Sequence, residues 1–198
     1  MIGAIVLAAG SSSRMGVSKQ LLDVYGDKLL RRTVRTILKT EIDAVAVVLG
    51  AREQDHRTIV EDLHVDIVSN TKWATGMGSS IKQGLAHLGR KHPDLSAVII
   101  FVCDQPLLNT AVISDLIAGY RRNKKPVIAS GYAGMPGVPV LFDKSIFDKL
   151  EALPDHQGAK KIILQNPADV HTIPFAGGEI DLDTMEDYNA FLTRESSE

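Results

Sequence analysis

Short runs of apolar, often β-branched residues alternate along this chain with stretches whose apolar residues recur at helical spacing. Runs of the first kind are typical of strands buried on both faces, and stretches of the second kind are typical of helices that cover a sheet. Because the two kinds take turns along the sequence, we expect an α/β fold with a mostly parallel central sheet flanked by helices on both faces.

The expected elements can be placed by residue number. Strands are expected at residues 2–7, 44–49, 65–69, 97–102, 127–130, 138–142 and 170–173. Helices are expected after Lys28, from about Ser80 with its hydroxyl as the N-cap, from about Thr110, and after Thr184. The last helix should turn Met185, Tyr188, Phe191 and Leu192 inward. The chain has 198 residues, no repeat and no long linker, so one domain spanning 1–198 is expected.

Three coarse features exclude whole classes of protein. The net charge of -2 gives no general attraction to nucleic acid, so no nucleic-acid partner is expected. The single cysteine, Cys103, excludes an intrachain disulfide framework and favours a reducing, cytoplasmic setting. The opening apolar run, residues 2–9, is too short to span a bilayer and lacks the preceding positive charges of a secretory signal. We therefore expect no membrane association.

The loop after the first expected strand has the composition of an anion site. Between Gly10 and Lys19 it carries four serines, two cations and no carboxylate. Glycine lets the backbone approach a ligand closely, and N–H groups, hydroxyls and positive charges suit a polyphosphate. The spacing from Gly10 to Gly16 is one residue too long for a Walker A loop, and no Gly-x-Gly dinucleotide fingerprint follows the strand. A solvated turn is the alternative interpretation.

Acidic residues occur at two places that could complete such a site. Asp104 follows the fourth expected strand, so it should project from the same rim of the sheet as the first loop. A carboxylate there suits Mg²⁺, although it could instead only cap the turn before Pro106. The segment 181–187 is also rich in carboxylates, and it reads equally as a helix start capped by Asp183 or Thr184.

The order of residues in these segments resembles one family. Leu7-Ala8-Ala9-Gly10, a serine-rich loop, Arg14-Met15-Gly16 and Lys19 resemble the signature of MobA/MocA-type nucleotidyltransferases of molybdenum cofactor biosynthesis. Further matches are Trp73-x-x-Gly76-Met77-Gly78-Ser79-Ser80, Asp104-Gln105-Pro106 and the segment 181–187. The resemblance runs over nearly the whole chain and implies a Rossmann-like domain that transfers a nucleoside monophosphate from a nucleoside triphosphate to a phosphorylated pterin, with Mg²⁺ as cofactor.

The resemblance also implies roles for individual residues. Arg14, Lys19 and Asp104 would be catalytic, and Asp104, Asp181 and Asp183 would hold the metal. The nucleotide would be bound by Leu7, Ala8, Ala9, Gly10, Arg14, Lys19, Gly50, Asn70, Gly78, Ser79 and Ser80. The phosphorylated acceptor would be bound by Gly137, Val138, Pro139 and Lys160.

The nucleotide, the acceptor and the partners are expected from smaller differences. Ala9 stands where guanylyl-transferring members tend to have glycine, which favours CTP over GTP and the cytidylyltransferase branch. Val138 stands where members of both branches often have histidine, so a sugar phosphate or polyol phosphate remains an alternative acceptor. A molybdoenzyme would be the recipient of a pterin product. An alternative of another class is a carrier that binds the cofactor without catalysis.

Overall fold

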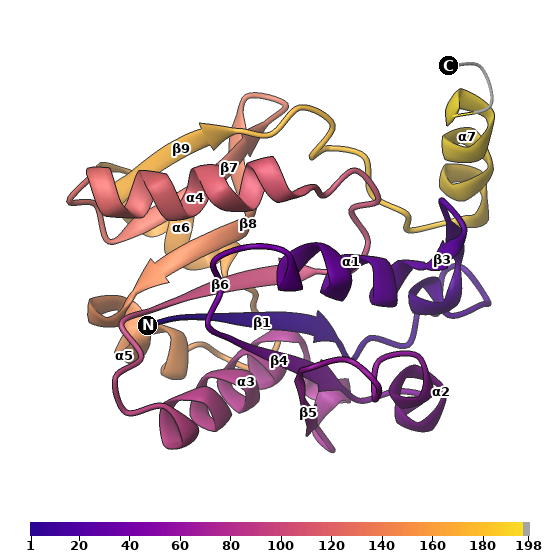
Figure 1. Cartoon of the computed structure of the whole chain (residues 1–198), viewed down its shortest axis with the longest axis horizontal. Helices are drawn as coiled ribbons and strands as arrows, with labels where there is room; N and C mark the ends of the chain where they lie inside the picture. The colour runs from indigo at the N-terminus through magenta and orange to yellow at the C-terminus, as the bar shows by residue number, and fades with distance from the viewer. Residues whose placement is uncertain (196–198) are drawn as a thin grey trace.

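The computed structural model describes residues 1–195 and is built on a seven-stranded sheet in the order β5-β4-β1-β6-β8-β7-β9 (Figure 1). Pairing is parallel throughout except around β8, which runs antiparallel to β6 and β7. The strands are β1 (Ile2–Ala8), β4 (Ala44–Leu49), β5 (Asp66–Ser69), β6 (Ala97–Val102), β7 (Val127–Tyr132), β8 (Met135–Asp143) and β9 (Val170–Pro174). The predicted α/β, Rossmann-like fold with a mostly parallel sheet is confirmed.

Helices cover both faces of this sheet. One face carries α1 (Leu29–Leu38) and α4 (Thr110–Arg122), and the other carries α3 (Met77–Lys91), α5 (Phe147–Glu151) and α6 (Lys160–Gln165). The central strand β1 is buried along its whole length and sends alternate side chains into the two layers. Ala4 and Val6 pack with the α1 and α4 side, whereas Ile5 and Leu7 pack with the α3 side. The continuous apolar run in the sequence follows from this two-sided burial.

Three sequence-based details are wrong or incomplete. Helix α3 begins at Met77 rather than near Ser80, and Ser80 lies inside it with its hydroxyl accepting from Asn70. Leu192 was expected to face inward, but its side chain is exposed on α7 (Met185–Glu195). No element was expected at the positions of the short α2 (Glu53–Thr58), the hairpin β2 (Asp23–Val24) and β3 (Asp27–Lys28), α5 or α6.

The hairpin and α7 form a third, smaller core beside the main sheet. Met15, Leu182 and Phe191 are buried in it, together with residues of the hairpin and the start of α1. In Figure 1, α7 stands at the end of the molecule toward which the β1 arrow points. Distant parts of the sequence therefore meet at the carboxyl end of β1.

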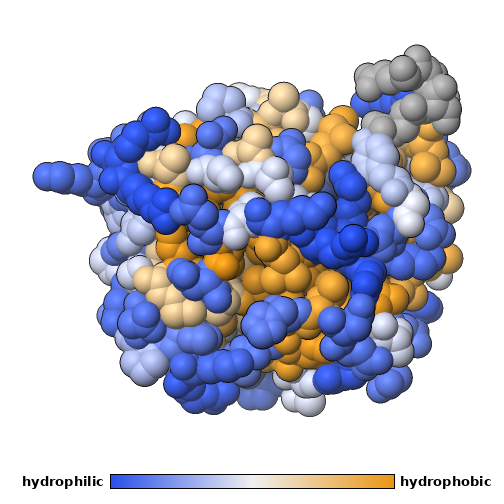
Figure 2. Space-filling view, in the orientation of Figure 1, coloured by the Kyte–Doolittle hydropathy of each residue, from blue (hydrophilic) through white to orange (hydrophobic). Residues whose placement is uncertain are grey.

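The outer surface in Figure 2 is largely hydrophilic, with apolar side chains showing mainly in the middle of this face. Within residues 1–195, no helix is long and apolar enough to cross a bilayer.

Candidate nucleotide site

The strand order itself indicates where a ligand would bind. From β1 the chain moves to β4 and β5 on one side and then returns to β6 on the other side of β1. In open α/β sheets the crevice at the carboxyl ends of two such strands is the usual ligand site. Leu7 of β1 pairs with Val102 of β6, so the first loop and Asp104 leave the sheet side by side. The two sequence features that suggested a polyphosphate and a metal therefore share one crevice.

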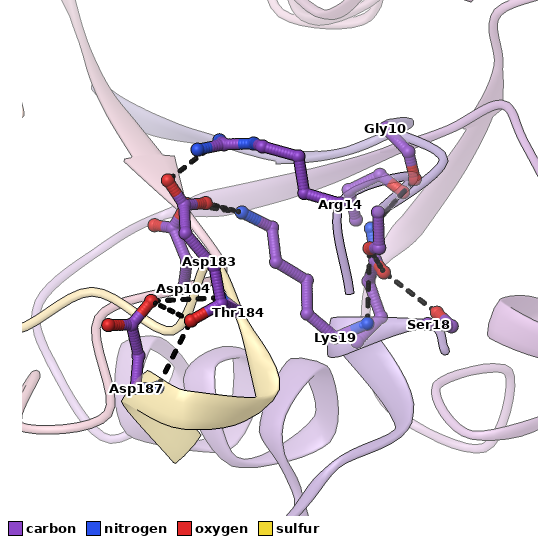
Figure 3. A network of polar contacts seen from close by, with 11 residues as sticks. Gly10, Arg14, Ser18, Lys19, Asp104, Asp183, Thr184 and Asp187 are labelled. Carbon is purple, nitrogen blue, oxygen red and sulfur yellow. Dashed lines mark hydrogen bonds and ion pairs between the residues drawn. The ribbon is translucent and has the colours of Figure 1, made fainter. Parts of the chain in front are cut away.

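The ammonium group of Lys19 lies between two carboxylates at this point (Figure 3). Its Nζ is 2.6 Å from Asp104 Oδ2 and 3.1 Å from Asp183 Oδ1. The side chains of Lys19 and Asp104 are each only 19% exposed, so water screens this pair little. Arg14 reaches the other oxygen of Asp183, 2.7 Å away, from a far more open position. The sequence-predicted catalytic residues Arg14, Lys19 and Asp104 are thus brought together.

Burial and charge act against each other on these groups. Burial tends to lower the pKa of Lys19, but the negative charge of Asp104 and the hydrogen bonds to both carboxylates more than offset it, and the pKa is raised. Burial tends to raise the pKa of Asp183, but Lys19 and Arg14 hold it below its ordinary value. Lys19 is therefore cationic and Asp183 anionic at neutral pH, as the binding of a phosphate and of a cation would require.

Cys103, next to Asp104, has an unreactive thiol. Its thiol is fully buried, and burial raises its pKa to about 12. A thiol that stays protonated is a poor nucleophile.

The segment 181–183 is fixed to the end of β6 by its backbone. The N–H of Leu182 donates to the carbonyl of Asp104 at 2.9 Å, and the Leu182 side chain is fully buried in the third core. Asp181 and Asp183 flank this anchor. Burial, followed by the charges of Asp183 and Asp104, raises the pKa of Asp181, which places three carboxylates in one electrostatic environment.

These carboxylates fit a hard divalent cation. Asp104 and Asp183 point oxygens at the same ammonium group, and the mutual repulsion felt by Asp181 is the kind that a cation relieves. Mg²⁺ commonly takes one or two carboxylates and completes its shell with water and substrate phosphates. Within residues 1–195 no group of three or more acidic, histidine or cysteine side chains is close enough to form a complete protein cage. Oxygens of the substrate and of water would have to complete the coordination shell of a cation held by these carboxylates.

The alternative interpretation of the acidic segment as a helix start holds for part of it. Thr184 and Asp187 form a reciprocal cap, in which Asp187 Oδ2 accepts from the Thr184 N–H at 2.9 Å and Thr184 Oγ1 accepts from the Asp187 N–H at 3.1 Å. Because these two residues cap α7, Asp183 is left to face Lys19 (Figure 3).

A cavity of about 310 Å³ opens beside the Lys19–Asp104 pair. Its walls include Leu7, Ala9, Gly10, Lys19, Ser80 and Asp104 from the predicted set. They also include Gln20, Trp73, Met77 and Cys103, to which the sequence assigned no firm role. The cavity is large enough for part of a nucleotide and lies next to the cationic side chain that a triphosphate needs.

Other predicted nucleotide residues have structural contacts. The Asn70 side chain is buried and donates to the hydroxyls of Ser79 and Ser80 at 2.9 Å. The N–H of Gly78 donates to Asp155 O at 2.8 Å. Ala8 is fully buried in β1. Of these residues, Ser80 alone lines the cavity. Direct contact with a nucleotide stays a prediction for all of them.

Two glycines next to the cavity are required by close packing. A Cβ on Gly50 would lie 2.5 Å from the Cβ of Trp73, and a Cβ on Gly78 would lie 2.5 Å from Pro154 O. The Gly76-Met77-Gly78 pattern thus lets the segment 154–158 lie against the start of α3. That segment ends two residues before Lys160, which was expected to bind the acceptor.

We call the first loop with Asp104 and Asp183 the donor side, and residues 134–142 with 157–160 the acceptor side. On the acceptor side, Gly137, Val138 and Pro139 lie in β8, and the Val138 N–H donates to the Tyr132 hydroxyl at 3.1 Å. Lys160 begins α6 with an exposed side chain. Gln105 joins the two sides, because its buried amide donates to Val138 O at 3.1 Å and Gly178 O at 2.8 Å.

The fold and this crevice define a class, the nucleotidyltransferases of Rossmann-like fold. Within it, the chain belongs to the family of the MobA-like NTP transferase domain, whose model matches residues 4–170. The resemblance seen in the sequence motifs is therefore confirmed for the family.

Individual relatives have different names and activities. The chain is 24% identical to the molybdenum cofactor cytidylyltransferase of Escherichia coli K12, covering 94% of this chain and 93% of that protein. It is 29% identical to the nicotine blue oxidoreductase of Paenarthrobacter nicotinovorans, covering 92% of each. Among solved structures, the Mycobacterium sp. strain JC1 homologue of Rv0371c of Mycobacterium tuberculosis superposes with a TM-score of 0.82 at 27% identity, covering 98% of this chain and 96% of that one.

Proposed function

We propose that this protein is a Mg²⁺-dependent nucleotidyltransferase that moves CMP from CTP to the phosphate of molybdopterin or the molybdenum cofactor and releases pyrophosphate. The observation that supports this most directly is that the Lys19 ammonium lies 2.6 Å from Asp104, beside a cavity at the carboxyl ends of β1 and β6, where the strand order reverses. A lysine and a carboxylate in this crevice can hold a triphosphate and its counter-ion together.

In the proposed reaction, an acceptor phosphate oxygen attacks the α-phosphorus and pyrophosphate leaves from the opposite side. Lys19 lies against the α-phosphate, where negative charge grows, and Arg14 binds the outer phosphates from its exposed position. Asp104, with Asp181 or Asp183, holds Mg²⁺, which supplies charge neutralisation and alignment of the phosphates. A protein nucleophile is unnecessary, because the acceptor itself forms the new bond.

The nucleotide and the acceptor rest on different support. Ala9 lines the cavity, which gives it a position from which to influence the base, and it is the residue that favours CTP over GTP. The name of the Escherichia coli relative supports the molybdenum cofactor as acceptor. Val138 on the acceptor side is the difference that keeps a sugar phosphate or polyol phosphate as the rival acceptor.

The test is a screen of CTP, GTP, ATP and UTP with Mg²⁺ against molybdopterin-loaded and unloaded preparations, with pyrophosphate release as the readout. The proposal predicts release that needs CTP, Mg²⁺ and the loaded acceptor. If the unloaded preparation releases pyrophosphate once a sugar phosphate or polyol phosphate is added, that phosphate is the acceptor instead of the pterin. Cofactor binding without pyrophosphate from any triphosphate would favour a carrier.

A further inference from the structure

A buried histidine outside the catalytic group contacts the first loop. His56 lies in α2 and is fully buried, and its Nε2 is 2.7 Å from Ser18 Oγ. Ser18 immediately precedes Lys19, and both Ser18 and Gln20 are almost completely buried. Beneath the exposed polar loop there is therefore a buried network of polar side chains, and α2 contributes His56 to it.

The hydrogen-bond directions in this buried network follow from Gln20. Its Nε2 is 3.3 Å from Ala8 O and 3.1 Å from Gly10 O, and since carbonyl oxygens only accept, the amide nitrogen must face them. The Gln20 oxygen must then accept from the hydroxyls of Ser12 at 3.1 Å and Ser18 at 2.8 Å. The single hydroxyl proton of Ser18 is committed to Gln20.

His56 must therefore be the donor to Ser18. With its own proton used, Ser18 Oγ can only accept from His56, which puts the ring proton on Nε2 and a lone pair on Nδ1. Nδ1 is buried and has no hydrogen-bond partner among the described residues. Within residues 1–195, the bond to Ser18 is therefore the one hydrogen bond that the His56 ring makes.

The network acts on the atoms that face the cavity. Because the peptide unit is planar and trans, turning the Gly10 carbonyl onto Gln20 points the Ser11 N–H in the opposite direction. Ser11 lines the cavity. The Lys19 N–H is also fixed, because it donates to Ser12 Oγ at 3.1 Å. The buried network thus sets the direction of the Ser11 N–H and the position from which the Lys19 side chain begins.

We propose that His56 is a positioning residue for the triphosphate, which acts by donating from Nε2 to Ser18 and so fixes Gln20, the Gly10–Ser11 peptide and Lys19. This inference rests on the proposed function for its ligand, a triphosphate chain. It predicts that His56 governs affinity for the triphosphate more than the rate of transfer, because bound phosphates would help to order a loosened loop.

The test uses inorganic triphosphate with Mg²⁺ as the probe, which needs neither the base nor the acceptor. By titration calorimetry, His56→Met and Ser18→Ala should each weaken binding up to about tenfold, as expected for one buried hydrogen bond. His56→Gln should bind within about twofold of wild type, because its amide can donate from the position of Nε2. The double variant Ser18→Ala/His56→Met should be little weaker than either single variant. His64→Met, at an exposed histidine, is the matched control.

Three outcomes would overturn the inference: wild-type affinity in His56→Met, a His56→Gln variant as weak as His56→Met, or strictly additive losses in the double variant. Thermal unfolding of each variant shows whether a loss is a folding defect, in which case His56→Gln and Ser18→Ala decide. Pyrophosphate release by the wild type separates the two proposals. If the variants lose triphosphate affinity as predicted but the wild type releases no pyrophosphate, the proposed function alone is contradicted. If the wild type releases pyrophosphate but His56→Met keeps its triphosphate affinity, this inference alone is contradicted.

Discussion

The donor side and the acceptor side of the site are held by different interactions. On the donor side, Lys19, Asp104 and Asp183 meet through direct ion pairs, and the loop rests on buried side-chain hydrogen bonds. On the acceptor side, Val138 and its neighbours are held in a strand, and Lys160 projects from the surface. Ion pairs and buried networks tolerate little change, whereas an exposed lysine tolerates much. We infer that the acceptor side is where family members diverge.

The largest effect is expected at the donor side. Lys19→Ala should lower the rate of pyrophosphate release by about a hundredfold to a thousandfold, because a preorganised charge of this kind contributes about 3–4 kcal/mol to the transition state. Lys28→Ala, at a lysine paired with Asp23 on the hairpin, should leave the rate unchanged. Steady-state kinetics with circular dichroism as a folding check decide, and a Lys19→Ala variant of normal turnover would remove this residue from the mechanism.

Asp104→Ala should abolish the response of pyrophosphate release to Mg²⁺. Without Asp104, the carboxylates of Asp181 and Asp183 lack the partner that faces them from the loop after β6. A Mg²⁺ titration of the rate measures this, with the exposed Asp115→Ala variant on α4 as the control. A full Mg²⁺ response in the Asp104 variant would show that the metal site has been placed wrongly.

Gly78→Ala tests the junction between the two sides. The new Cβ would meet Pro154 O at 2.5 Å and Gln157 O at 2.8 Å, so we expect a loss of about 1–3 kcal/mol in the free energy of unfolding. Gly89→Ala lies in the same helix with open space around it and should instead be stabilising by about 0.5–1 kcal/mol. Denaturant unfolding compares the two; equal effects would mean that residues 154–157 do not press on α3.

His56 should make stability depend on pH. Burial lowers its pKa; Arg52 lowers it further and Asp55 raises it, while Ser18, which it contacts in the loop, is uncharged. The unfolded chain then binds a proton near pH 6.5 that the folded chain binds only at lower pH, so stability falls as the pH drops below that value. The slope is at most about 1.4 kcal/mol per pH unit. His56→Gln should flatten the curve between pH 7 and 5, and an unchanged curve would contradict a buried neutral histidine.

The smallest effect is expected on the acceptor side. Lys160→Ala should raise the KM for the acceptor less than about tenfold and leave triphosphate binding unchanged, because an exposed lysine contributes little to binding a charged group. Lys161→Ala, at a lysine that is also exposed and lies one residue further along, is the matched control. A large loss of triphosphate affinity in Lys160→Ala would erase the distinction between the two sides.

The sequence predicted what depends on local order and missed what depends on long-range packing. The parallel strands and the Lys19 and Asp104 positions follow from apolar runs and from the rule that strand ends meet at one rim. Gln20 and His56 were missed because a lone polar residue shows its burial only when the tertiary contact is known. Gly78 was expected to bind the nucleotide, yet the approach of residues 154–157 is what requires a glycine at this position, and no local pattern reveals that.

The most direct test is a crystal structure with a non-hydrolysable CTP analogue and Mg²⁺, in which the environment of Lys19 Nζ is measured. The account predicts a phosphate oxygen within hydrogen-bond distance of Nζ, with Asp104 turned to the metal in place of its 2.6 Å contact with the lysine. An analogue bound elsewhere, with the Lys19–Asp104 pair intact, would contradict it.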